Sequence, residues 1–465
     1  MMIEIPENIR EDIHELVKRF HKNGYECYLV GGSVRDLIMG KSVLDYDFAT
    51  DAHPEEVMKI FRRVIPTGIK HGTVSVIIKG KSFEVTTYRS DGEYIDCRRP
   101  ESVSFSKTLE EDVKRRDFTI NGLAYDFIND EVIDFVGGIG DIERRVVRTI
   151  GNPILRFSED GLRPYRACRF AAKLNFTIEE ESFRSIEETL SIAKRVSKER
   201  IRDELIKLIA TEKPSIGFEY LRKSGLLRLF LPELVNCYGV EQNKYHLYDI
   251  YYHSLYSCDA IPGVDPIIKL AALLHDIGKM TTKRMGDDAD YTFYNHEVIG
   301  AKITKKIMKR LKFSNEEISR VSNLILNHMF HYIDEWTDGA VRRFMRKVAL
   351  ENLNDLFLLR LADRRGNGMR DGLPAPIHDL IKRIEKVIED ENAITVKDLD
   401  INGYVIMEEF KLKPGPQIGK ILNGLLEMVL DCPEMNQRTI LIKKAYEIYE
   451  SLVEYDSSRQ CRRIQ

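Results

Sequence analysis

The pattern of hydrophobic and polar positions changes near residue 150. Before that point, β-rich runs such as YECYLV (25–30) and TVSVII (73–78) alternate with short helix-like stretches. After it, apolar residues recur almost throughout at spacings of three and four, which is typical of amphipathic helices. The sequence therefore predicts an α/β N-terminal head followed by a mostly α-helical neck, body and tail. The expected boundaries are 1–150, 151–240, 241–370 and 371–465.

The clearest hairpin is TVSVIIKGKSFEVTTYR (73–89), in which two β-rich runs surround Lys79-Gly80-Lys81. This hairpin places Glu84 on a strand that can lie beside the strand expected around residue 46. Later in the chain, glycine and proline predict loops at 368–379 and 413–419.

Two acidic residues, Asp45 and Asp47, stand one position apart in LDYDF (44–48). Side chains alternate faces along a strand, so both carboxylates can bind one divalent cation. Glu84 would supply a third carboxylate. These residues predict a Mg²⁺ site for chemistry on a nucleoside triphosphate. A solvated strand end for the aspartates and a purely structural Glu84 are the alternatives.

A glycine turn, Gly31-Gly32, follows the strand YECYLV and precedes the helix-like VRDLIMG (34–40). A turn that opens a helix presents backbone N–H groups and the positive end of the helix dipole. We therefore expect it to hold phosphate oxygens beside the acidic pair.

Composition adds limits to this interpretation. The chain has 465 residues, 43% of them hydrophobic and 31% charged, which is ordinary for a soluble globular protein, and its net charge is −3. Any nucleic-acid binding must then come from local basic patches. Seven cysteines without a CxxC pair predict a reduced, cytoplasmic protein. No apolar run is long enough to span a bilayer, so no membrane association is expected.

Five motifs carry a resemblance to a known family. GGSVRDLIMG, LDYDFATD, EVTTYRSDGEYIDCRRPESVSF, EEDVKRRDFTINGLAYD and SEDGLRPYRACRFAAKLNF occur in the order seen in class II tRNA nucleotidyltransferases. These are the CCA-adding enzymes, whose relatives are the bacterial poly(A) polymerases. The resemblance implies a polymerase-β-like nucleotidyltransferase head and a helical remainder that holds tRNA.

The resemblance also implies an activity and its residues. The expected reaction adds CCA to the 3′ end of tRNA from CTP and ATP without a nucleic-acid template, and it releases pyrophosphate. Asp45, Asp47 and Glu84 would be the catalytic metal carboxylates. The expected nucleotide-binding residues are Gly31, Gly32, Arg35, Arg115, Arg116, Asp117, Asn121, Glu159, Asp160, Arg163, Arg166 and Arg169. Poly(A) polymerase is the alternative within this class.

Base choice can be reasoned from EDGLR (159–163). If this segment is helical, Asp160 and Arg163 project from the same face. Cytosine and adenine both show an amine donor beside a ring-nitrogen acceptor, whereas guanine and uracil show the reverse. A carboxylate only accepts and a guanidinium only donates, so the pair matches C and A. An exposed helical salt bridge is the structural alternative, and the resemblance gives Glu159 an orienting role.

The helical half holds a second set of candidate ligands, which resembles the HD-domain metal phosphohydrolases. In that family the first His, the HD pair and the last Asp bind one metal, which here would be His253, His275, Asp276 and Asp363. His296 and His328 would hold a second ion or contact a phosphate. An imidazole-rich site favours Ni²⁺, Mn²⁺ or Co²⁺. His21, His246 and His331 are expected to be structural. A chain that is mainly an HD phosphohydrolase with an RNA-binding head is the alternative from another class.

Three basic segments, 302–312, 341–347 and 362–370, are candidates for tRNA phosphate contacts or else solvated helix faces. The segment around Asp96, Arg98, Arg99 and Glu101 resembles the loop of enzymes that add the complete CCA. The sequence leaves the oligomeric state open.

Overall fold

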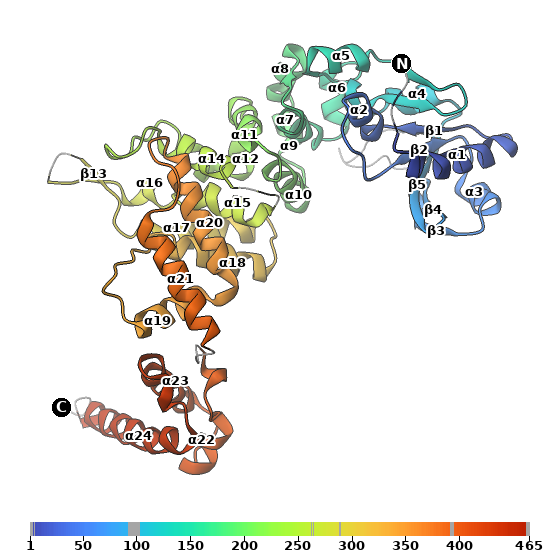
Figure 1. Ribbon diagram of the computed structural model, residues 1–465. Helices are drawn as coiled ribbons and strands as arrows, with labels where there is room; N and C mark the ends of the chain where they lie inside the picture. Colours follow the sequence, from blue (N-terminus) through green and yellow to red (C-terminus); the bar gives the residue numbers. More distant parts are fainter. Residues whose placement is uncertain are drawn as a thin grey trace. The chain divides into compact units, whose positions relative to one another are not determined.

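The computed structural model describes residues 3, 5–91, 103–261, 263, 265–287, 290–390 and 395–461. The predicted loop around Asp96, Arg98, Arg99 and Glu101 therefore lies outside the described residues. The chain forms two compact units, which Figure 1 shows with their helices and strands labelled. The first unit comprises Met1–Val240, Pro262–Leu270 and Lys306–Ser314, and the second comprises Glu241–Ile261, Ala271–Lys305 and Asn315–Gln465.

The head is built on a seven-stranded sheet with the strand order β3-β4-β5-β2-β1-β8-β9. Its strands are β1 (Cys27–Val30), β2 (Asp47–Thr50), β3 (Val64–Gly68), β4 (Thr73–Ile78), β5 (Lys81–Thr87), β8 (Leu123–Asp126) and β9 (Glu131–Asp134). The short strands β6 (Arg89–Asp91) and β7 (Val103–Phe105) pair separately. Within the large sheet, β2 and β5 run parallel and the other neighbours run antiparallel. The predicted α/β head is confirmed.

Strands β4 and β5 form the predicted hairpin. Lys79 and Gly80 both have positive φ, 47° and 85°. Two successive residues in this region make the type I′ turn, whose twist matches that of the flanking strands.

The helices of the head are amphipathic or short. In α1 (Glu7–Lys22), the apolar side chains of Ile13, Leu16, Val17 and Phe20 follow the helical spacing and are all buried. The remaining helices here are α2 (Gly32–Ile38), α3 (Pro54–Ile60), α4 (Leu109–Lys114) and α5 (Gly138–Arg144). Helix α1 contacts β1, and α3 contacts β4.

The rest of the first unit is helical, as predicted, apart from the short parallel pair β10 (Val146–Val147) and β11 (Thr177–Ile178). Its helices are α6 (Pro153–Glu159), α7 (Arg163–Leu174), α8 (Glu180–Glu188), α9 (Leu190–Ala193), α10 (Lys198–Ile209), α11 (Pro214–Lys223), α12 (Leu226–Phe230) and α13 (Pro232–Val235). Helix α7 packs against α10 and α11. At the contact with α11, a β-carbon on Gly217 would lie 2.9 Å from the Cys168 carbonyl oxygen, so glycine permits the close approach.

The second unit is also mostly helical. Its helices are α14 (Ile250–Asp259), α16 (Lys279–Thr282), α17 (His296–Arg310), α18 (Asn315–Asn327), α19 (Asp338–Val348), α20 (Leu353–Gly366), α21 (Ala375–Glu389), α22 (Gly403–Phe410), α23 (Pro416–Asp431) and α24 (Arg438–Cys461). Helices α15 (Pro266–Leu274) and α17 cross the division between the units, and β12 (Arg284–Met285) pairs with β13 (Tyr291–Thr292). The two predicted loops end earlier than expected, at residues 374 and 415, because α21 and α23 begin there with proline in the first turn.

The tail packs against α19. Arg343 binds Glu427 at 2.8 Å and Asp431 at 2.6 Å, and Arg346 binds Glu427 at 2.8 Å. The arginines of segment 341–347 therefore hold α23, which differs from the expected phosphate contacts. None of the helices in the described part of the chain combines the length and apolar character needed to cross a bilayer.

Candidate functional site

The parallel pairing of β2 with β5 brings two predicted carboxylates together. Asp47 lies directly opposite Glu84 in the register. Asp45 precedes the strand, which begins at Asp47, so its expected place on the strand is wrong. The alternation nevertheless extends back to it, because Asp45 and Asp47 are exposed while Tyr46 between them is buried.

Charge at these carboxylates favours a cation. Partial desolvation raises the pKa of Asp47 although its side chain reaches solvent, and the negative charges of Glu84 and Asp45 raise it further, against the opposing effect of Arg116. Mutual repulsion of this kind is relieved when a divalent ion binds between the carboxylates. Oxygen-only ligands suit Mg²⁺, so the residues present fit the expected ion.

The glycine turn lies beside these acids. Gly31 has φ 78° and ψ −136°, a conformation that is essentially restricted to glycine. A β-carbon at this position would lie 3.0 Å from Nη1 of Arg116. Glycine therefore keeps the turn open next to a guanidinium, as a phosphate site requires.

Arg115 and Arg116 share one buried carboxylate that the sequence reasoning missed. Asp112 accepts from Arg115 at 2.6 Å and from Arg116 at 3.0 Å. Burial raises the pKa of Asp112, but the two arginines outweigh it and hold that pKa below the usual range. The EEDVKRRD spacing of three and four residues was the available signal, since such residues share a helix face.

A second network surrounds Asp117. Its carboxylate accepts from Arg166 at 2.7 Å and from the Asn121 amide at 3.0 Å, and Asn121 accepts in turn from Arg35. Burial raises the pKa of Asp117, but Arg166 and Asn121 lower it to about 2. Arg35 is buried and also binds Asp36 at 2.7 Å. The network fixes four of the predicted nucleotide-binding side chains in one arrangement.

The expected helical pairing of Asp160 with Arg163 is wrong. Helix α6 ends at Glu159 and α7 begins at Arg163, because Asp160 adopts an extended conformation between them. Asp160 binds Arg200 of α10 at 2.7 Å, a partner that nothing in the local spacing indicates. Arg163 binds Glu159 instead, which agrees with the orienting role expected for Glu159.

Arg163 is also held from a second side. Its guanidinium donates to the carbonyl oxygens of Arg156 at 2.8 Å and Arg115 at 3.1 Å. Arg169 is fixed similarly, by Glu204 at 2.6 Å and by the ring of Phe170, whose centroid is 4.1 Å away.

These side chains surround a cavity of about 580 Å³. Its lining includes nine cationic residues, Arg35, Arg89, Arg115, Arg116, Arg163, Arg166, Arg169, Lys173 and Arg200, against four acidic ones, Asp47, Glu84, Asp117 and Asp160. This excess of positive charge suits a strongly anionic ligand such as a triphosphate. All the predicted nucleotide-binding residues except Glu159 line the cavity, and Glu159 contacts it through Arg163.

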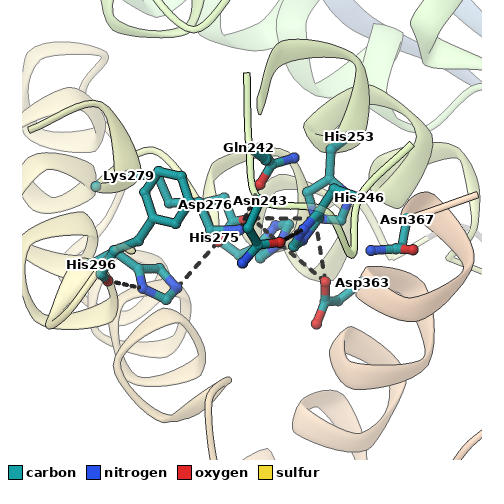
Figure 2. Close-up of polar contacts among 12 residues, drawn as sticks. Gln242, Asn243, His246, His253, His275, Asp276, Lys279, His296, Asp363 and Asn367 are labelled. Carbon is teal, nitrogen blue, oxygen red and sulfur yellow. Dashed lines mark hydrogen bonds and ion pairs between the residues drawn. The ribbon is translucent and has the colours of Figure 1, made fainter. Parts of the chain in front are cut away.

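The second unit holds the other predicted cluster, drawn in Figure 2. Nε2 of His253 lies 3.1 Å from Nε2 of His275, 3.2 Å from Oδ2 of Asp276 and 3.3 Å from Oδ1 of Asp363. Nε2 of His275 lies 3.2 Å and 3.6 Å from the same two oxygens. Ligands about 2.1 Å from a tetrahedral ion are separated by roughly 3.4 Å. The donor spacing therefore fits one transition-metal ion.

Asp276 faces a second pair of imidazoles with its other oxygen. Oδ1 lies 3.3 Å from Nε2 of His296 and 3.7 Å from Nε2 of His328, and these nitrogens are 3.3 Å apart. One carboxylate thus faces His253 and His275 on one side and His296 and His328 on the other.

The same kind of hydrogen bond to the backbone orients three of the imidazole rings. Nδ1 of His275, His296 and His328 each donates, at 2.7 Å, to the carbonyl oxygen three residues earlier. This bond uses Nδ1 as the donor, so that Nε2 is the nitrogen that faces the cluster and can bind a metal. Burial lowers the pKa of His275, but Asp276 and Asp363 raise it to about 10, which again indicates a place for positive charge.

His246, expected to be structural, joins the cluster. One of its ring nitrogens lies within 4.8 Å of donor atoms of His253 and Asp276, and its Nδ1 bonds to Asn243 Oδ1 at 2.7 Å. Burial is the main cause that lowers the pKa of His246, to about 3, so its imidazole is neutral as a ligand must be. The sequence HLYDIYYH gave no usable signal, because α14 begins at Ile250 and His246 lies before it, so helical spacing does not relate His246 to His253.

We call the group of His246, His253, His275, Asp276, His296, His328 and Asp363 the HD cluster. It opens into a cavity of about 540 Å³. Lys279, Arg360, Arg364 and Arg370 line it together with the metal-type ligands. Burial lowers the pKa of Arg364, and Arg370 and Arg360 lower it further, so these guanidiniums are close enough to repel one another. An anion bound among them would relieve that repulsion. Segment 362–370 thus contributes to this cavity.

The fold and the two sites define a nucleotidyltransferase head followed by an HD domain. Residues 27–148 match the poly(A) polymerase head domain, 175–237 match the probable RNA- and SrmB-binding site of polymerase A, and 245–368 match the HD domain.

Similar proteins identify the family within this class. The CCA-adding enzyme of Limosilactobacillus reuteri is 31% identical over 95% of this chain and 97% of its own length. That of Lactobacillus gasseri is 45% identical over 45% of this chain, an alignment that spans about half, 53%, of the relative's length. The crystal structure of the Bacillus stearothermophilus CCA-adding enzyme in complex with CTP is 27% identical, covers 98% of this chain and 100% of its own, and has a TM-score of 0.70. The chain belongs to the family of CCA-adding enzymes.

The ion pair at Asp117 predicts a pH dependence of stability. A folded pKa of about 2, against an ordinary 3.8, gives stability that is present above pH 4 and lost as the pH falls toward 2. The lost contribution should be about 2 kcal/mol. In urea unfolding, wild type should exceed Asp117→Asn in stability at pH 5, and the difference should shrink by that amount near pH 2. Glu110→Gln, at an exposed surface pair, is the control. A difference that does not change with pH would contradict this.

Proposed function

We propose that the protein adds C, C and A to the 3′ end of tRNA, with CTP and ATP as substrates and pyrophosphate as product. The observation that carries this is the position of Asp47 and Glu84 at a cavity with nine cationic residues. The relative of known structure was crystallised with CTP, which supports a nucleotide in the corresponding cavity. The free, buried cysteines Cys27, Cys168, Cys237 and Cys258 support a cytoplasmic location.

In this reaction the 3′-oxygen of the RNA forms a bond to the α-phosphorus, and the bond from that phosphorus to pyrophosphate breaks. Asp45, Asp47 and Glu84 would hold Mg²⁺, which when bound supplies positive charge to the triphosphate and the leaving group. Arg115 and Arg116, fixed by Asp112, would orient the phosphates. The protein thus contributes positioning and charge.

Asp160 and Arg163 would read the base, each positioned by its own partner. Arg200 holds Asp160, and Glu159 with two carbonyl oxygens holds Arg163. A fixed acceptor and a fixed donor match the edges of cytosine and adenine and oppose those of guanine and uracil. Separate anchors let the two side chains be rigid without sharing a helix.

The poly(A) polymerase alternative is not favoured. The head-domain match is described for poly(A) polymerases, but the full-length relative from L. reuteri is a CCA-adding enzyme. The alternative that the chain is mainly an HD phosphohydrolase with an RNA-binding head is also weakened. A head that only bound RNA would not need the carboxylates of Asp47 and Glu84 opposite one another.

We further propose that the HD cluster hydrolyses phosphoesters such as 2′,3′-cyclic nucleotides or 2′-nucleotides. His253, His275, Asp276 and Asp363 would hold one ion, with His246 next to it, and His296 and His328 would hold a second ion or contact the phosphate. Ni²⁺, Mn²⁺ or Co²⁺ suits these ligands, and a bound ion lowers the pKa of water. Water oxygen bonds to phosphorus, one ribose–oxygen bond to phosphorus breaks, and the released ribose oxygen takes the proton. Arg360, Arg364 and Arg370 would bind the anion.

Asp47→Ala should abolish nucleotide addition, because it removes a carboxylate that neutralises the cation. Purified protein, tRNA lacking its 3′ end, CTP and ATP would be followed by product length at nucleotide resolution. We expect a loss of at least a thousandfold, with unchanged thermal unfolding. Glu55→Ala, an exposed acid of α3, should retain full activity. Substantial nucleotide incorporation by Asp47→Ala would show that Asp47 is not a ligand of the metal.

Arg200→Ala should weaken base selection without touching the base itself. Freed from Arg200, Asp160 loses its fixed orientation, so discrimination of CTP and ATP against UTP and GTP should fall roughly tenfold or more. Competing-nucleotide incorporation measures this ratio. Lys207→Ala on the same helix is the matched control, since its side chain is exposed and lies outside the cavity. Unchanged selectivity in Arg200→Ala would show that Asp160 needs no such anchor.

Replacing both His275 and Asp276 with Ala should abolish metal-dependent hydrolysis of 2′,3′-cyclic nucleotides and spare CCA addition, because the head has its own carboxylates. Asp47→Ala should abolish CCA addition and spare the hydrolysis of 2′,3′-cyclic nucleotides. Bound Ni²⁺ or Mn²⁺, measured by elemental analysis, should fall in the double variant. If wild type binds no transition metal, the cluster has a structural role and the hydrolase proposal fails.

A further inference from the structure

A second cavity adjoins the HD pocket. It has a volume of about 370 Å³ and is lined by Glu297 of α17 and by residues of α18, α19 and the turn that joins α18 to α19. Glu297 and Met329 line both cavities. The two cavities therefore lie next to each other, on either side of Glu297 and Met329.

Aromatic side chains dominate this second cavity. Trp336, Phe330 and Phe344 line it. The ring of Trp336 meets Phe344 at 5.7 Å and Tyr332 at 5.4 Å, both edge-on, with interplanar angles of 61° and 75°. Within the described ranges, no aromatic ring stacks face to face on Trp336. Trp336 is partly exposed and lines the cavity, so its indole offers ring surface to a base.

The charges around the cavity suit an RNA strand. Lys347 lines it and, among the described residues, has no carboxylate within 4.0 Å. Arg343 also lines it but is neutralised by Glu427 and Asp431. Lys347 is thus the cation available to a phosphate. Glu297, which lines both cavities, presents an acceptor that a ribose hydroxyl can satisfy.

We propose that the HD site acts on the end of an RNA strand of at least two nucleotides. The reacting phosphate lies at the metal-type cluster, the neighbouring base stacks on Trp336, and the phosphate between the nucleosides pairs with Lys347. This inference rests on the proposed hydrolase function, which by itself requires only a mononucleotide.

Trp336 is the single tryptophan of the chain, so its fluorescence reports on this cavity alone. The full-length, Mn²⁺-loaded protein would be titrated with a ribodinucleotide that carries a slowly hydrolysed 3′-phosphorothioate, and with the mononucleotide that carries the same group. The dinucleotide should shift the tryptophan emission and bind roughly tenfold more tightly, because stacking of one base adds that much affinity. The deoxyribose dinucleotide should bind more weakly than the ribose form.

Two variants test the assigned contacts. Lys347→Gln should lose several-fold in dinucleotide affinity and leave mononucleotide affinity unchanged. Trp336→Phe keeps an aromatic ring for packing, and should reduce the dinucleotide preference measured by competition. Lys382→Gln, an exposed lysine of α21 outside both cavities, should behave as wild type.

The outcomes separate this inference from the hydrolase proposal. If mononucleotides are hydrolysed but the dinucleotide binds no better and leaves the emission unchanged, the second cavity is not a subsite and the inference alone fails. If no phosphoester is hydrolysed yet the dinucleotide preference persists and depends on Lys347, the binding inference stands and the hydrolase proposal fails. Equal binding of ribose and deoxyribose forms overturns the assignment to RNA.

Discussion

The parallel pairing of β2 with β5 is the constraint on which the head site depends. It places Asp47 opposite Glu84 within a sheet whose other neighbouring strands run antiparallel. A parallel connection needs a crossover, and here the chain between β2 and β5 supplies α3, β3 and β4. A shift of one residue in this register would turn Glu84 to the opposite face. The buried Phe48, Phe83 and Val85 prevent that shift, since they would then be exposed.

Around this pair, buried carboxylates organise the cations. Asp112 holds Arg115 and Arg116, Asp117 holds Arg166, and Glu204 holds Arg169. Each pair costs desolvation, which offsets part of the stability that its electrostatic attraction contributes. What the pairs provide is orientation, because each acid fixes the side chain of its arginine beside the cavity. The cavity retains an excess of positive charge because these acids are fewer than the cations.

Sequence reasoning succeeded where the signal was local. The hairpin around Lys79-Gly80, the strand–turn–helix at Gly31 and the HD pair all depend on residues close together in the chain, and the structure has each of them. It failed for Asp160 because an extended residue interrupts the helix, and its partner Arg200 lies 40 positions away. It missed His246 and Asp112 for a different reason. Whether their side chains reach a site depends on which face of the helix or loop points toward it. The types of residue in the chain indicate little about that orientation.

The two sites are separated by the chemistry of their ligands. The head offers carboxylate oxygens, which suit a hard ion that keeps some of its water, whereas the HD cluster offers four or five imidazoles around a shared aspartate. Imidazoles bind divalent transition metals in preference to Mg²⁺, so the two ligand sets would favour different ions. The orientation of the imidazoles reinforces this selection, because Nδ1 of His275, His296 and His328 is already used by a backbone carbonyl. The difference in ligand type would thus let one chain carry two metal sites with different preferences.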